Sequence, residues 1–238
     1  MCNLGLLKQD FKINRWVLIL FYVLQTLSLC LAWMIRRMHL IQISDVFWDT
    51  IPTILIPAGL AIMLAYSTVL ARKQDGTMDF LLTTPLNIRK IFRTKAVFVF
   101  LNLFLLLALS TGFGLLTKGY LLSGQWQAAS YIRLNIGAFC LQFLISSYCL
   151  LISCSVRHTR SYTIFGVLLP VLMYGIYVIY YLNPGLQVLQ FLSVFSLYRQ
   201  RWYLTGNGLS YLGEGIFLAA GVAMALLAGS RFREQTAA

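Results

Sequence analysis

The chain has 238 residues, of which 59% are apolar and only 11% are charged, and its formal net charge is +12. An ordinary soluble domain has about 45–50% apolar and about 25% charged residues, so this composition excludes a water-soluble globular protein. The positive charge does not indicate nucleic-acid binding either, because the basic residues stand at the ends of apolar runs and not along one stripe. We therefore expect no nucleic-acid partner.

Six apolar runs approach or exceed the roughly 20 residues that a helix needs to cross the hydrocarbon core of a membrane. Backbone groups find no partner in lipid, so continuous runs of this kind predict α-helices. The sequence thus predicts an all-α polytopic membrane protein with a single transmembrane domain over 1–238. The expected spans are 16–35, 50–71, 96–117, 134–156, 161–182 and 209–230.

The first residues predict a short interfacial helix on the inner surface of the membrane. Leu4, Leu7 and Phe11 recur at helical spacing, while Lys8 and Lys12 recur on another face. An amphipathic helix of this kind places its apolar side in lipid and its cations beside anionic headgroups. The alternative is an ordinary basic flank before the first span.

The basic residues also predict the orientation of the chain. With the N-terminus in the cytoplasm, thirteen lysines and arginines fall in inner segments and six in outer ones. This asymmetry agrees with the positive-inside rule and places both termini on the cytoplasmic side of the cell inner membrane. Arg36 and Arg37 are the main exception, because they fall in an outer segment.

The segment between the second and third spans predicts a short helix, a corner and a second short helix. Met78, Leu81 and Leu82 recur at i, i+3 and i+4 and form one apolar face. Pro85 ends the first helix, since the residue before a proline avoids the α region, and Asn87 can cap the second helix. The apolar face must be buried on the membrane surface or on another protein. We favour a protein, because the patch is small and is flanked by acids that anionic lipid repels.

The same stretch resembles the inner-loop motif of type-2 ATP-binding-cassette (ABC) exporter permeases. That family shows an acid, Gly-Thr, a hydrophobe, an acid, two leucines, Thr-Pro and a basic stretch that leads into the third span. The sequence departs from this pattern in its aspartates, where glutamates are commoner, and at Gln74, which stands in place of another acid. The matching positions are Asp75, Gly76, Thr77, Met78, Asp79, Leu81, Leu82, Thr84, Pro85, Ile91 and Lys95.

The resemblance implies a mechanism that the motif alone does not prove. In that family the first helix is a coupling helix, seated in a cleft of a separate ATPase subunit that binds ATP and Mg. Two permeases and two ATPases form the exporter, so the implied partners are the cytoplasmic ABC ATPase, a second copy of this chain as a homodimer, and membrane lipids. The implied interface is Asp75, Thr77, Met78, Asp79, Leu81 and Leu82, shaped by Gly76 and Pro85 next to Thr84, with Arg157, His158 and Arg160 as a second contact.

The outer end of the fifth span is rich in tyrosine, and a re-entrant segment is expected within 186–208. Tyr174, Tyr177 and Tyr181 follow one another at i, i+3 and i+7, either as an aromatic belt or as part of a substrate path. Glu214 is the one acid well inside a predicted span. It either serves that path or favours the positive N-terminus of its own helix.

The sequence shows no catalytic constellation and no metal-ligand spacing. It also has no GxxxxGK[ST] motif for nucleotide phosphates, so we expect no cofactor on this chain and a transport subunit that is not an enzyme. The predicted function is the permease of an ATP-driven exporter that moves an amphipathic or hydrophobic substrate, such as a peptide, drug or lipid-like molecule, out of the cell. The alternative is an ATP-independent transporter or channel, or a membrane immunity or sensor protein.

Overall fold

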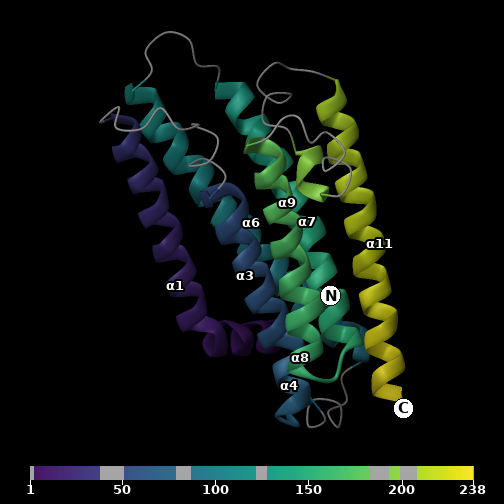
Figure 1. Ribbon diagram of the computed structural model, residues 1–238. Coiled ribbons are helices and arrows are strands. Elements are labelled where there is room, and N and C mark those ends of the chain that lie inside the picture. The colour runs from purple at the N-terminus through teal and green to yellow at the C-terminus, as the bar shows by residue number, and fades with distance from the viewer. Residues whose placement is uncertain are drawn as a thin grey trace.

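The computed structural model of the chain describes residues 3–37, 51–78, 87–121, 128–182, 193–198 and 208–237, and nearly all of these are helical. Long helices stand side by side in one bundle (Figure 1). Six helical stretches are long and apolar enough to cross a membrane, which confirms the predicted all-α class. The elements are α1 (Leu4–Arg37), η1 (Ile51–Leu55), α3 (Ile56–Ala65), η2 (Tyr66–Leu70), α4 (Ala71–Gln74), α6 (Ile88–Leu121), α7 (Ala128–Ser155), α8 (Thr159–Tyr162), η3 (Thr163–Leu168), α9 (Leu169–Leu182), η5 (Val194–Leu197) and α11 (Leu209–Ala237).

One end of the bundle, the lower end in Figure 1, carries the turn after α4, the turn between α7 and α8, and the C-terminus. We call it the loop end. The first turns of α1 cross this end before the helix runs along the side of the bundle (Figure 1). α1 is helical without a break from Leu4 to Arg37, but its first turns are bent away from the direction of the span (Figure 1). The predicted interfacial helix is therefore the bent first part of α1 and not a separate element.

The second and fourth spans form the centre of the bundle, because they have the largest buried share of the six. Leu60 and Leu64 of α3 and Leu141 and Leu150 of α7 are completely buried there. The first, fifth and sixth spans instead leave most of their large apolar side chains exposed, such as Leu27, with 60% of its surface accessible. An apolar exterior of this kind suits a lipid environment and not water.

The second span is irregular where prolines interrupt it. Pro57 has no N–H to donate to the carbonyl of Thr53, as an α-helical residue would. Gln142 of α7, which is fully buried, donates from Nε2 to the carbonyls of Thr53 at 3.3 Å and Ile54 at 2.8 Å. A side chain of the neighbouring helix therefore compensates for the backbone donor that the proline removes, as lipid-embedded prolines require.

A second irregularity lies lower in the same span, at the π-helical turn η2. A π turn disturbs the regular i→i−4 ladder of carbonyl acceptors and is frequent at functional sites. Carbonyls around η2 accept hydrogen bonds from other helices: Ser153 Oγ donates to Ala65 O and Tyr162 Oη to Ile62 O, both at 2.8 Å. The fifth and fourth spans thus both support this turn.

The fifth span has the same construction. Pro170 cannot donate to the carbonyl of Gly166, and the span contains the π-helical turn η3 just before that proline. Cys149 of α7 is buried and its Sγ lies 3.7 Å from Gly166 O, within reach of a weak S–H hydrogen bond. Cys149 therefore supports a helix that its proline interrupts.

Helices α7 and α11 pack along much of their length, and Gly221 is a point of close approach between them. A Cβ at Gly221 would lie 2.6 Å from Cδ1 of Phe143 on α7. We expect Gly221→Leu to lower the free energy of unfolding by about 1–3 kcal/mol, because overpacking forces neighbouring atoms apart. Thermal unfolding of the detergent-solubilised protein measures this effect. Gly215→Leu on the same helix is the matched control, since nothing lies within 4 Å of its Cβ position, and an equal loss in both variants would contradict the packing argument.

Candidate functional site

The predicted coupling segment begins with a sharp turn at the loop end. α4 ends at Gln74, and Asp75 N donates to Ala71 O at 2.9 Å to close its last turn. Gly76 follows with φ of 68°, in the left-handed region that glycine enters at little cost. Helical geometry resumes at Thr77. The turn thus resembles an ordinary helix end with a glycine after the cap.

A second turn, between α7 and α8, lies directly against the first. Gln74 joins the two turns, since its Nε2 donates to Arg157 O at 3.2 Å and its Oε1 accepts from Thr159 Oγ1 at 2.9 Å. Lys73 adds a third link, from Nζ to Cys154 O at 2.8 Å. The exposed residues of both turns therefore form one surface, which we call the composite surface. Its members are Gln74, Asp75, Gly76, Thr77, Arg157, His158, Thr159 and Arg160.

Beneath the composite surface three charged side chains from three helices meet inside the protein. Arg72 of α4 donates a hydrogen bond from its guanidinium to Oδ1 of Asp10 on α1. Lys95 of α6 has its Nζ 3.9 Å from the same oxygen and donates to the carbonyl of Thr68 in η2 at 2.6 Å. The side chains of all three are at most 7% exposed. We call Asp10, Arg72 and Lys95 the charge cluster.

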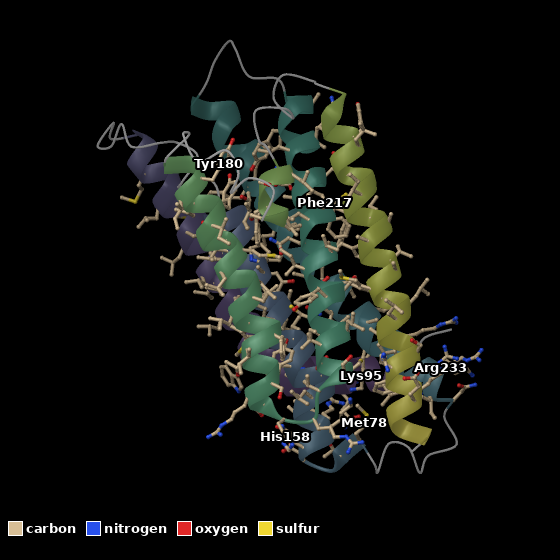
Figure 2. The ribbon with its side chains drawn as sticks, turned by 45° about the vertical axis from the view of Figure 1, so that its right-hand side comes forward. Met78, Lys95, His158, Tyr180, Phe217 and Arg233 are labelled. Atoms are coloured by element: carbon tan, nitrogen blue, oxygen red, sulfur yellow. The ribbon has the colours of Figure 1, made fainter. Side chains whose placement is uncertain are left out.

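The charge cluster sets Lys95 apart from the other cations at the start of α6. Lys95 lies inside the bundle (Figure 2), whereas Arg89, Lys90 and Arg93 of the same helix are exposed. The reason is local: Asp10 and the Thr68 carbonyl offer the ammonium group partners within the protein, so it need not reach the membrane surface. Burial of a charge is tolerated only where such partners exist.

Met78 differs from the prediction as well. Its side chain is 1% exposed and belongs to the core of the bundle near the loop end (Figure 2). An apolar face was expected, but at this position it packs against the chain itself and not against a partner. The other predicted contacts of the coupling helix, Asp79, Leu81, Leu82, Thr84 and Pro85, lie outside the described residues.

Asp10 was missed at the sequence level, although a signal existed. Leu6, Asp10 and Asn14 recur every four residues and are the buried face of the first turns of α1. The apolar pattern through Leu4 and Phe11 suggested another face, but Leu4 is 80% exposed. The spacing of Leu6, Asp10 and Asn14 therefore marks the buried face of α1 better than the spacing of Leu4 and Phe11 does.

The opposite end of the bundle holds the predicted substrate-path residues. Tyr174 and Tyr177 of α9 both pack against Phe195 of η5, with ring centroids 5.7 Å and 6.5 Å apart. Tyr198, directly after η5, is fully buried and donates from Oη to Leu134 O of α7 at 3.1 Å. These described residues of the expected re-entrant segment fill the space beside the tyrosines. The side chain of Tyr181 and the rest of 186–208, apart from 193–198 and 208, lie outside the description.

Glu214 faces α7 and not the tyrosine pair. Arg133 of α7 is a nearby cation, but Glu214 Oε1 is buried without a hydrogen-bond partner in the described part of the chain. Arg133 itself donates to Ser210 Oγ at 2.9 Å and stacks 3.8 Å from the ring centroid of Tyr211. The acid therefore lies beside a polar cluster of two adjacent helices. Within the described part of the chain, no three His, Cys, Asp or Glu side chains come together to hold a metal ion.

The comparison with models of protein families finds none that matches this chain, and the comparison with curated proteins finds no match either. The geometry of the loop end and the motif between the second and third spans are therefore the features that bear on function. The composite surface is exposed and built from two separate turns, and the charge cluster connects it to α1 and α6.

Proposed function

We propose that the chain is the membrane permease subunit of an ATP-driven ABC exporter, and that the composite surface docks on a separate cytoplasmic ATPase. The observation that carries the proposal is the pair of hydrogen bonds through which Gln74 joins the coupling turn to the turn 157–160. A partner that pushes on one turn must move the other, because both belong to one hydrogen-bonded surface. Joint movement of the two turns is what an ATPase needs in order to change the arrangement of the helices.

The rest of the arrangement supports this assignment. Six helices suit a multi-pass membrane domain, and the chain has no phosphate-binding loop of its own, so ATP and Mg would bind the partner. In this proposal the loop end faces the cytoplasm, and both termini lie there. The exposed apolar sides of α1, α9 and α11 would face lipid or a second copy of the permease, and an apolar interior would carry an amphipathic or hydrophobic substrate.

The alternative, an ATP-independent transporter or channel, needs an ionisable group along a pathway. Glu214 is the residue that could serve, because its Oε1 is buried without a hydrogen-bond partner in the described part of the chain and Arg133 is a nearby cation. A single acid beside a cation is a weaker indication of function than the composite surface, which two turns and the motif form together. We retain the exporter as the proposed function.

Charge reversal on the composite surface tests the proposal without changing net charge. The double variant Asp75→Lys/Arg160→Glu reverses two exposed charges in opposite directions. We expect at least a tenfold loss in the amount of co-expressed ABC ATPase that co-purifies with the tagged full-length permease. A loss of that size corresponds to about 1.4 kcal/mol, well within the effect of like charges placed across an interface.

The matched control reverses another exposed pair at the same end of the bundle. Arg231→Glu/Glu234→Lys also keeps the net charge, and it inverts an ion pair in which both side chains are more than 60% exposed. We expect this variant to bind the ATPase as well as the unmodified chain does. If both variants bind normally, or if the unmodified permease binds no ABC ATPase, the proposed function is wrong.

A further inference from the structure

We propose that Asp10 is a positioning residue that links the composite surface to α1, so that a movement of the surface becomes a movement of the first span. The inference rests on the proposed function, because it requires a partner that moves the surface. It adds something which the motif does not contain: a defined route from the coupling turn to a helix that begins more than sixty residues earlier.

The route consists of contacts between described residues. Thr77, exposed on the composite surface, donates from Oγ1 to the backbone carbonyl of Arg72 at 3.2 Å. The guanidinium of the same Arg72 donates to Asp10, on the first turns of α1. One residue therefore contacts the docking surface through its backbone and the first helix through its side chain. A displacement of Thr77 reaches Asp10 through a single intermediate.

The electrostatics make this route stiff. Asp10 is the only acid in α1, and its carboxylate is 1% exposed and faces two cations. Its Oδ2 is buried and makes no hydrogen bond in the described part of the chain, so the charge depends on Arg72 and Lys95. Separating Asp10 from Arg72 would leave a buried carboxylate with one cation at 3.9 Å, which is costly. Movement of α1 together with Arg72 avoids this cost, so we expect the helix to follow.

The third member of the cluster connects the route to a flexible element of the second span. Lys95 Nζ donates to Thr68 O within η2, the π-helical turn that directly precedes α4. A π turn and an α turn differ by one residue in hydrogen-bond register, and such turns often mark places where a helix changes shape. The charge cluster therefore holds both the base of the coupling segment and the turn at which the second span can adjust.

Hydrogen exchange of the full permease–ATPase complex in nanodiscs tests this inference. For the unmodified complex we expect ATP with vanadate to change exchange at least twofold both at 71–78 and in the first turns of α1. The variant Asp10→Leu/Arg72→Met/Lys95→Met removes all three charges, so no ion is left buried without a partner. We expect it to keep the response at 71–78 and to lose the response in α1. Asp10 is not a positioning residue if α1 still responds in this variant, or if α1 of the unmodified complex does not respond.

Two further variants keep the result interpretable. Glu234→Gln removes an acid of equal charge from an exposed site at the same end, and it should leave the response of α1 intact. Thr77→Val removes the hydrogen bond from Thr77 to the Arg72 carbonyl, at an exposed position. This variant tests the route even if the triple variant does not fold. At saturating ATPase it should reduce the α1 response at least twofold, and an unchanged response overturns the inference. Failure of the unmodified chain to bind the ATPase instead overturns the proposed function itself.

Discussion

Replacing Arg72 with methionine is expected to lower the free energy of unfolding by about 3–5 kcal/mol, because removing one member of a buried ion pair leaves the other charge without compensation. Asp10 would retain Lys95 at 3.9 Å, but that ammonium group already donates to Thr68 O. Methionine has a similar length and fills the space, so the loss reports the charge and not a cavity. Equilibrium unfolding of the purified protein in detergent measures the change.

The control is an ion pair at the same end of the bundle that water can reach. Arg231 and Glu234 lie 3.1 Å apart with side chains 62% and 63% exposed. Such pairs contribute about 0–1 kcal/mol, so Arg231→Met should have a small effect. Adding Asp10→Leu to Arg72→Met should recover part of the lost stability, since no uncompensated carboxylate is then buried. If Arg72→Met is no worse than Arg231→Met, the charge cluster does not stabilise the fold.

The helices could be predicted from the sequence because a lipid-spanning helix is a local property. Length and apolarity of one run decide it. Each predicted span falls within a described helical stretch, apart from the first residue of the second span and the last residue of the fourth. The cap at Asn87 is equally local, and it is confirmed: Asn87 Oδ1 accepts from Arg89 N at 3.0 Å, at the start of α6.

The charge cluster could not be predicted in the same way. Counting lysines and arginines for orientation treats each one as solvated, whereas Arg72 and Lys95 are paired with Asp10 across 62 and 85 residues of chain. Which cation turns inward depends on the packing of α1 against α6, where Phe11 meets Phe98 with ring centroids 4.8 Å apart. Such long-range pairing leaves no periodic trace in a single sequence.

Met78 shows a different limit. Its apolar character and helical spacing were evident, but periodicity tells only that a face is buried and not what buries it. In the structure the chain's own core does so. The π-helical turn η2 is a similar case, since Tyr66–Leu70 contains neither proline nor glycine. Its irregularity is stabilised by Ser153, Tyr162 and Lys95 on other helices, so it follows from tertiary contacts.

Replacing Gln142 with leucine is expected to cost about 2 kcal/mol of stability, because it removes the donor that satisfies the carbonyls beside Pro57. In water such carbonyls would bind solvent, but in the centre of a membrane-spanning bundle they would lose a partner, and an unsatisfied buried acceptor costs about 1–3 kcal/mol. Ser146→Ala is the control on the same helix, since that hydroxyl donates only to Phe143 O of its own helix. It should cost much less in the same unfolding assay.

A double-mutant cycle with Pro57 decides whether Gln142 acts through the proline. Pro57→Ala restores a backbone N–H that can donate within the second span, so the Thr53 carbonyl no longer depends on Gln142. In the Pro57→Ala background, Gln142→Leu should therefore cost at least about 1 kcal/mol less than in the unmodified chain, a coupling typical of residues that share a partner. Additive effects, within about 0.5 kcal/mol, would mean that the amide serves some other purpose. Gln142→Leu is expected to cost less in the Pro57→Ala background because the backbone N–H restored at position 57 and the Gln142 side chain would both donate to the same Thr53 oxygen.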